Sequence, residues 1–464
     1  MPIKSSRLFL LLIAAAASVV TGCSSAGTPS PSSEPGINTV PTLGSAVLDA
    51  STLYRQIGLI AAPAPVPFVG KISAFASASP DTTLVLVSLS LPNKALTFTR
   101  EGDRYRAPYE VKLTLNRGTV EAAKVDAMEI VRVGSFREIN RTDESIIFQH
   151  YFHVAPGTYV LSANVRDVGG SRGGAQEVSI SVPALTPGHL STPTLVYEAT
   201  GRSTLDSVPG LLASPRSSAV FGRDSTVAVY VEGYGQGARL PVVFVVRNEK
   251  GAQVWRDSTQ LARRGGLFSG IVNVPISTVG VGMAQVYFTR RDAPQDTASA
   301  PLFVSFGEDI PLMSYEDMLG YLRFFAVSSR LNALRDAAPE RRATEWAQFL
   351  RATDPVPETP INEDLQSYFA RIQIANGQFR TDRNPGWLSD RGSVYVALGE
   401  PDQIFERNVS GTLTTTQMGG STRLQIWQYR QYNTQLVFYE ETGRWRLTRP
   451  SETEFLAINA RRQH

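Results

Sequence analysis

The chain has 464 residues, with 45 basic and 42 acidic side chains and a formal net charge of +3. Apolar and aromatic contents of 42% and 9% are ordinary for globular protein and argue against wholesale disorder. The near balance of charges gives no case for a nucleic-acid partner. The chain is too long for one domain, so we expect several.

The N-terminus has the form of an export signal. Two basic residues precede an uncharged apolar run, residues 8–20, which is too short to span a bilayer comfortably. The sequence Val20-Thr21-Gly22-Cys23 follows, and it resembles the lipobox of bacterial lipoproteins. This resemblance implies a signal peptide over residues 1–22 and acyl chains such as palmitate on Cys23, which would anchor the mature protein in the lipid bilayer. An ordinary cleaved signal with an incidental cysteine is the alternative.

Cys23 is the only cysteine, which excludes a disulfide within the chain and a catalytic thiol elsewhere. Ser24 follows it, where lipoproteins retained in the inner membrane commonly have aspartate. The resemblance therefore implies a lipid-anchored protein of the cell envelope, at the outer membrane. Residues 23–48 are rich in Ser, Gly, Pro and Thr, and we expect the lipidated N-terminus to continue there as a flexible tether.

Two β-rich regions follow, residues 66–190 and 195–308, and each predicts an immunoglobulin-like β-sandwich. In the first region Thr83–Leu89 is nearly continuous apolar, as a strand covered on both faces would be. Tyr109–Leu115 alternates, as a half-exposed strand would. Two further strand patterns flank Ala155-Pro156-Gly157, which predicts a hairpin-like connection. Neither region carries a recognisable catalytic motif.

His150 and His153 invite a metal interpretation, but residues three apart on a strand point to opposite faces. No third ligand lies nearby in the sequence. We therefore predict no metal site and no cofactor.

Helical spacing begins after Pro311. Ser314 and Asp317 form a capping-box pattern at the start of a first helix, and Pro339 suits the first position of a second. A third helix is expected after Asn362. Together these helices predict a connector to a C-terminal domain.

One motif near the C-terminus carries a family resemblance. Gly386-Trp387-Leu388-Ser389-Asp390 is followed by Arg391-Gly392, an apolar run Val394–Leu398, and Gly399-Glu400-Pro401-Asp402. In this order the residues resemble the GWxTD domain of bacterial secreted and lipid-anchored proteins, with Ser389 where that family usually has threonine. The resemblance covers about Met313–Leu447. We assign residues 313–450 to the connector and an α+β domain, with helices on a small sheet, and residues 451–464 to a tail.

The motif residues also have physical roles that we expect independently. Val394–Leu398 is predicted to be a strand between two tight turns. The three glycines, Pro401 and the hydroxyl or carboxylate of Ser389, Asp390 and Asp402 would shape the turns and bond their amides. Trp387 would bury its ring against the helices. Arg391 beside Asp390 would form an ion pair or an anion site.

The sequence thus predicts a non-enzymatic binding or scaffold protein anchored at the outer membrane, with an envelope protein or glycan as partner. The alternative is an envelope hydrolase that uses the carboxylates of Asp390, Glu400 or Asp402. The region has no histidine before terminal His464, so the usual general base is missing. We therefore assign no catalytic residue.

Overall fold

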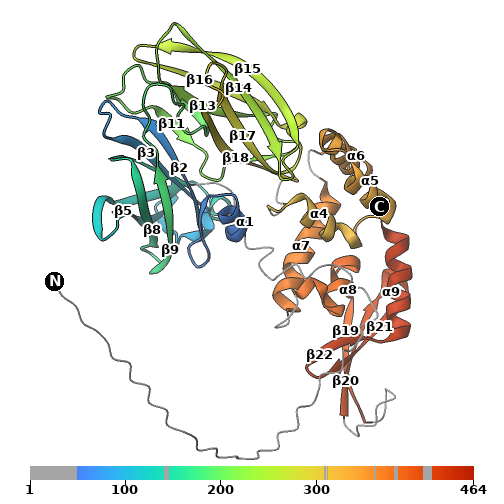
Figure 1. Ribbon diagram of the computed structural model, residues 1–464. Helices are drawn as coiled ribbons and strands as arrows, with labels where there is room; N and C mark the ends of the chain where they lie inside the picture. The colour runs from blue at the N-terminus through green and yellow to red at the C-terminus, as the bar shows by residue number, and fades with distance from the viewer. Residues whose placement is uncertain are drawn as a thin grey trace, which may run out of the picture. The chain divides into compact units, whose positions relative to one another are not determined.

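The computed structural model describes residues 50–140, 146–307, 310, 312–359, 362–380, 385–410 and 421–463. Strands dominate up to residue 307; helices and one further sheet follow (Figure 1). The predicted fold class, β-sandwich parts followed by an α+β part, is confirmed. Cys23, the predicted signal peptide and the whole of the predicted tether lie outside the described residues.

The first β-rich part is a sandwich of two antiparallel sheets. Its elements are α1 (Ala50–Gln56), β1 (Ile60–Ala62), β2 (Phe68–Ala76), β3 (Thr83–Leu91), η1 (Asn93–Ala95), β4 (Thr99–Glu101), β5 (Arg104–Arg117), β6 (Val120–Val133), α2 (Phe136–Ile139), β7 (Ile146–Val154), β8 (Gly157–Asp167) and β9 (Arg172–Val182). One sheet has the order β1-β2-β3-β7; the other has β4-β5-β8-β9, with β6 also paired to β5. Val85 and Leu89 of the first sheet share one buried core with Val111 and Leu113 of the second.

The connection at Ala155-Pro156-Gly157 is not the hairpin that the sequence predicts. β7 pairs with β3, whereas β8 pairs with β5 and β9, so the chain passes here from one sheet to the other. A hairpin and a crossover between sheets use similar turn residues, and the flanking strands alternate in both cases. The local sequence therefore could not separate the two.

The second β-rich part is built from one continuous path of strands. Its elements are β10 (Thr194–Thr200), β11 (Gly210–Ala213), β12 (Ser218–Val220), β13 (Thr226–Gly233), β14 (Arg239–Asn248), β15 (Gln253–Arg264), β16 (Leu267–Pro275), α3 (Ile276–Val279), β17 (Gly282–Arg290) and β18 (Thr297–Ser305). The order is β11-β10-β13-β16-β15-β14-β17-β18-β12. β15 and β16 pair only beside their turn, from Ala262↔Ser269 to Arg264↔Leu267, so the path folds over there. Val231 of β13 and Phe244 of β14 consequently share one core.

An apolar cluster joins the two sandwiches. Phe75 of β2 and Leu84 and Leu86 of β3 pack with Val196 of β10 and Tyr230 of β13, and all five are buried. Every position of β3 is buried, which confirms the prediction of a strand covered on both faces. One face of β3 packs in the core of its own sandwich, and the neighbouring sandwich covers the other face.

Hydrogen bonds reinforce the same junction. Gln149 of β7 donates to the Leu211 carbonyl and accepts from the Ala213 amide, both at 2.7 Å. The Thr192 amide donates to the Ala74 carbonyl at 3.0 Å, and the Ala74 amide donates to the Thr192 hydroxyl at 3.1 Å. These hydrogen bonds link strands β2 and β7 of the first sandwich directly to the second sandwich.

The C-terminal part packs helices on a four-stranded antiparallel sheet of order β19-β20-β21-β22. Its elements are α4 (Tyr315–Tyr321), η2 (Leu322–Phe324), α5 (Ser328–Asp336), η3 (Pro339–Arg341), α6 (Arg342–Thr353), α7 (Glu363–Gln378), η4 (Gly386–Leu388), α8 (Asp390–Leu398), β19 (Gln403–Ser410), β20 (Ser421–Tyr429), η5 (Arg430–Tyr432), β21 (Thr434–Glu441), β22 (Arg444–Leu447) and α9 (Arg449–Arg462). The Ser314 hydroxyl caps α4 by accepting from the Asp317 amide at 3.1 Å, and the Asp317 carboxylate accepts from that hydroxyl at 2.8 Å. Asn362 caps α7 by accepting from the Leu365 amide at 2.8 Å. The predicted helix starts at Ser314 and Asn362 are confirmed, whereas Pro339 begins the 3-10 segment η3 that leads directly into α6.

The prediction of a strand over Val394–Leu398 is wrong, because these residues form the end of helix α8. Every residue from Gly392 to Leu398 is buried. A helix that is buried all round shows no polar face, so its sequence looks the same as a buried strand. The capping residues Ser389 and Gly399 are the features of the sequence that indicate a helix here.

Residues expected as a C-terminal tail instead form most of α9. Phe455 and Ile458 are buried, and the Phe455 ring lies 6.2 Å from that of Phe324. α9 has few other apolar side chains facing the domain, which is why its sequence gives a weak helical pattern.

Candidate functional site

The predicted GWxTD-like motif begins with a tight turn that buries its tryptophan. Trp387 is fully buried, with its ring stacked 4.7 Å from Tyr321 and the Arg323 guanidinium 4.8 Å from its centre. The Asn376 side chain of α7 accepts from the Trp387 amide at 3.1 Å. The predicted burial of Trp387 against the preceding helices is thus observed.

The glycines on either side permit two close backbone approaches. A Cβ on Gly386 would lie 2.0 Å from the Ala375 carbonyl oxygen, and one on Gly392 would lie 1.8 Å from the Gly386 carbonyl oxygen. Any larger residue would force α7, η4 and α8 apart. These glycines are required by packing rather than by an unusual backbone angle.

Ser389 is the N-cap of α8. Its hydroxyl accepts from the Gly392 amide at 3.0 Å and donates to the Gly386 carbonyl at 2.7 Å. The hydroxyl is common to serine and threonine, so the departure from the family's usual residue preserves both bonds.

Asp390 fixes the helix to the sheet. Its Oδ2 accepts from the Leu447 amide at 2.6 Å, although the two residues are 57 positions apart. The carboxylate therefore bonds the backbone of β22, where the sequence suggested a local turn.

Arg391 lies between aromatic rings. Its guanidinium is 5.2 Å from the centre of the Phe379 ring and 5.1 Å from that of Trp445, and Nη1 lies 3.4 Å from Gln425 Oε1. Burial lowers the pKa of Arg391, and the nearby Glu406 carboxylate opposes that shift. The guanidinium is thus a cation packed between aromatic rings, at the position where the sequence predicts an ion pair with Asp390 or an anion site.

The second half of the motif ends α8 and starts the sheet. Gly399 follows the helix with φ of +88°, a left-handed conformation that favours glycine, and its carbonyl accepts from the Tyr429 hydroxyl at 3.0 Å. Pro401 is half-buried in the turn after it. Asp402 Oδ2 accepts from the Arg430 amide at 2.7 Å.

The carboxylates of the motif do not converge on one point. Asp390 and Asp402 bond different backbone amides at opposite ends of α8, whose residues 390–398 rise by about 12 Å at 1.5 Å per residue. Glu400 is exposed in the intervening turn. Paired acid and base chemistry requires carboxylates within about 5–10 Å of a shared reacting group.

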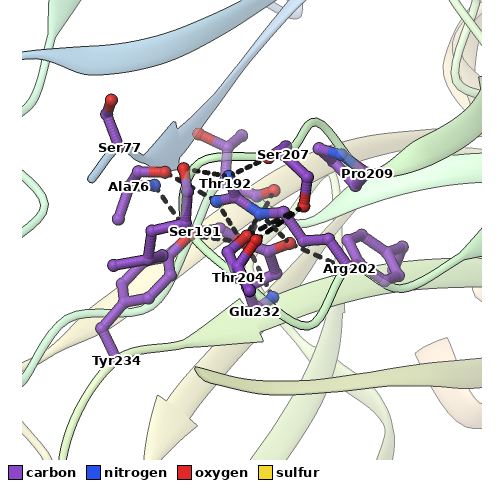
Figure 2. A network of polar contacts seen from close by, with 12 residues as sticks. Ala76, Ser77, Ser191, Thr192, Arg202, Thr204, Ser207, Pro209, Glu232 and Tyr234 are labelled. Carbon is purple, nitrogen blue, oxygen red and sulfur yellow. Dashed lines mark hydrogen bonds and ion pairs between the residues drawn. The ribbon is translucent and has the colours of Figure 1, made fainter. Parts of the chain in front are cut away.

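Sequence reasoning missed a buried polar network between the sandwiches (Figure 2). Arg202 donates to Glu232 of β13 and also to the Ala76 carbonyl at the end of β2, at 2.6 Å. The hydroxyls of Tyr230 and Tyr234 both donate to Glu232 at 2.8 Å. Burial and the Glu232 charge raise the pKa of Tyr234. Glu232, a single charged residue in the apolar run of β13, is the feature of the sequence that could have indicated a buried polar network.

A buried lysine lies at the same junction. Lys71 of β2 is 4% exposed, and its Nζ lies 3.4 Å from the Pro193 carbonyl oxygen. Burial lowers the pKa of the Lys71 amine to about 7. Its position in an alternating strand gave no sign that the outer face would be covered.

The described residues hold no cluster typical of a metal centre and no membrane-spanning helix. Among them, no group of three or more His, Cys, Asp or Glu side chains is placed to hold a metal ion. His150 and His153 lie on opposite faces of β7, with His150 beside Phe152 at 4.6 Å between ring centres. No helix within the described ranges has the length and apolar content needed to cross a bilayer.

Residues 285–454 match the family model described as the GWxTD domain. This region of the chain is a GWxTD domain. The match begins within β17, ahead of the connector helices, and ends within α9. No curated protein matches the sequence.

Several solved structures resemble the chain at low identity. The BSP domain of a biofilm associated protein has 9% identity and a TM-score of 0.17, over 51% of this chain and 52% of that one. Red sea bream transglutaminase has 11% identity and a TM-score of 0.15, over 51% and 31%. Dimeric latent PorU from Porphyromonas gingivalis has 12% identity and a TM-score of 0.23, over 51% and 20%. The chain thus spans about half or less of these proteins, and such TM-scores carry no functional inference.

Proposed function

We propose that this protein is a non-enzymatic, lipid-anchored scaffold of the cell envelope that presents its GWxTD domain to an envelope protein or glycan. One observation carries the proposal. The polar side chains that distinguish the motif bond backbone groups of their own domain, at Ser389, Asp390 and Asp402. They build the frame of the domain, and this leaves recognition to its surface.

The anchor is supported by the sequence of the N-terminus. A basic, then apolar, segment leads to Val20-Thr21-Gly22-Cys23, and Ser24 follows the cysteine. We propose acylation of Cys23 and retention at the outer membrane. Acyl chains on one residue anchor firmly because each buried methylene contributes about 0.8 kcal/mol.

The experiment combines localisation with partner capture. Wild-type protein and the Cys23→Ala variant are expressed in a bacterium with an outer membrane, and envelopes are fractionated. The proposal expects the wild type in outer-membrane fractions and the variant released in soluble, folded form. Tight membrane association of the variant would overturn the anchor.

Crosslinking in intact envelopes then tests the scaffold role. We expect the wild type to yield a reproducible crosslinked protein or glycan that the released variant yields less often. Absence of any specific crosslink at native expression would contradict a scaffold function.

One variant distinguishes this proposal from the alternative, an envelope hydrolase that uses Asp390, Glu400 or Asp402. If Asp390 is part of the frame, Asp390→Ala leaves the Leu447 amide without its acceptor and lowers stability by about 1–3 kcal/mol. A hydrolase would instead give a stable variant that has lost turnover of envelope substrates.

A further inference from the structure

A small polar cavity lies beside the C-terminal end of α8 in the GWxTD domain. Its volume is about 60 Å³, enough for a group of a few atoms. Three helices and the η2 segment supply its walls. The lining residues are Phe324, Phe325, Asp364, Tyr368, Arg371, Ala397 and Arg462.

Two arginines from different helices meet at this cavity. Arg371 of α7 donates through Nε to the Val396 carbonyl at 2.9 Å, and Arg462 of α9 donates through Nη1 to the Ala397 carbonyl. Each bond uses one nitrogen to cap the end of α8. Within the described residues, no hydrogen bond occupies the terminal nitrogens of Arg371 or the Nε and Nη2 of Arg462.

The two guanidinium groups are close enough to repel each other. Burial lowers the pKa of Arg371, the Arg462 charge lowers it further, and the Asp364 carboxylate opposes both effects. Tyr368 forms an uncharged wall, because it is buried and its hydroxyl donates to the Tyr321 carbonyl at 2.5 Å. Two cations and one anion at the cavity leave a surplus of one positive charge.

Arg462 lies at the solvent side of the cavity, because the residue is exposed. Its guanidinium also lies 5.4 Å from the centre of the Tyr432 ring. The cavity is therefore reached from solvent past Arg462. A ligand group can enter while the remainder of the ligand stays outside.

We propose that this cavity binds a monoanionic carboxylate, held between the free nitrogens of Arg371 and Arg462. A carboxylate has two acceptor oxygens in a plane, which suits the forked donors of arginine. Its single charge matches the surplus at the cavity, whereas a phosphate dianion would exceed it beside Asp364. The inference holds whether or not the protein is anchored through Cys23.

The test uses the folded chain without its signal peptide and titrates sodium acetate at constant ionic strength, with sodium chloride as the balancing salt. Binding is followed by the ¹⁵N–¹H signals of the arginine Nε groups. We expect a saturable shift for Arg371. Arg462→Gln should weaken acetate binding about tenfold or more, which corresponds to one hydrogen bond to a charged group.

Arg461→Gln is the matched control, because Arg461 is the exposed neighbour of Arg462 on α9 and does not line the cavity. Its acetate affinity should equal that of the wild type. Arg462→Lys keeps the charge and should bind more weakly than the wild type but more tightly than Arg462→Gln. The proposal is overturned by a linear response to acetate, by equal loss in the Arg461 variant, or by tighter binding of inorganic phosphate than of acetate.

Discussion

Arg202 and Glu232 form a doubly hydrogen-bonded ion pair, Nε to Oε1 at 3.0 Å and Nη2 to Oε2 at 2.8 Å, with side chains only 1% and 0% exposed. A buried pair of this kind is sensitive to loss of one partner, because the remaining charge stays buried without compensation. We predict that Glu232→Gln lowers the free energy of unfolding by about 3–5 kcal/mol. Urea denaturation followed by tryptophan fluorescence measures it.

The exposed pair of Arg106 and Glu101 provides the control for that measurement, at 3.3 Å and with side chains 37% and 45% exposed. Arg106→Ala should cost less than about 1 kcal/mol. A loss for Glu232→Gln no larger than this would mean that the buried pair contributes little to the junction.

Lys71 should make stability depend on pH. Its pKa is about 7 in the folded protein, lowered by burial, against about 10.4 in an unfolded chain. Between these values the unfolded chain binds more protons, so the free energy of unfolding rises as pH increases from about 7 to about 10.4. Lys71→Met should remove this part of the rise and stabilise most at neutral pH and below.

Thermal unfolding of both proteins across pH 6–10 tests the Lys71 prediction, with Lys94→Met at an exposed position as the control. The control should follow the wild-type pH dependence. If the Lys71 variant also follows it, the amine does not titrate in this range.

Gly386 should tolerate no side chain. The added Cβ of Gly386→Ala would meet the Ala375 carbonyl oxygen at 2.0 Å and the Arg380 amide nitrogen at 2.8 Å. We expect a loss of about 1–3 kcal/mol or more, typical of overpacking. Gly377→Ala in α7 adds its Cβ in open space and should stabilise by about 0.5–1 kcal/mol. Equal melting temperatures for the two variants would contradict the close approach.

Ser389 should be replaceable by threonine but not by alanine. Ser389→Ala removes the acceptor for the Gly392 amide and should cost about 1 kcal/mol, as helix caps do. Ser389→Thr retains the hydroxyl and should stay within about 0.5 kcal/mol of the wild type. Chemical denaturation of the wild type and the two variants measures these free energies of unfolding. A threonine variant as unstable as the alanine variant would show that the cap is not the relevant contact.

Local signals in the sequence were sufficient for most of the elements. The caps at Ser314 and Asn362 and the alternation of Tyr109–Leu115 depend on neighbours within a few residues, and the structure has each of them. α8 was mistaken for a strand because burial on all sides removes the helical period from Val394–Leu398.

The contacts of the candidate site were harder to predict because they are long-range. Asp390 bonds Leu447, 57 residues away, and the sequence does not give the register that brings β22 to α8. Likewise, Arg202, which follows β10, meets Glu232 of β13 only once these two strands of the second sandwich have paired. Residue types pointed to a structural motif, but the partners of its side chains depend on the fold.

The double cover of β3 has a practical consequence for dividing the protein. A fragment ending after β9 would expose Phe75, Leu84 and Leu86 to water and leave an apolar patch of the kind that drives self-association. Expression of residues 50–306 as a unit keeps that face covered. The boundary visible in the sequence between the two sandwiches is therefore a poor place to cut the chain.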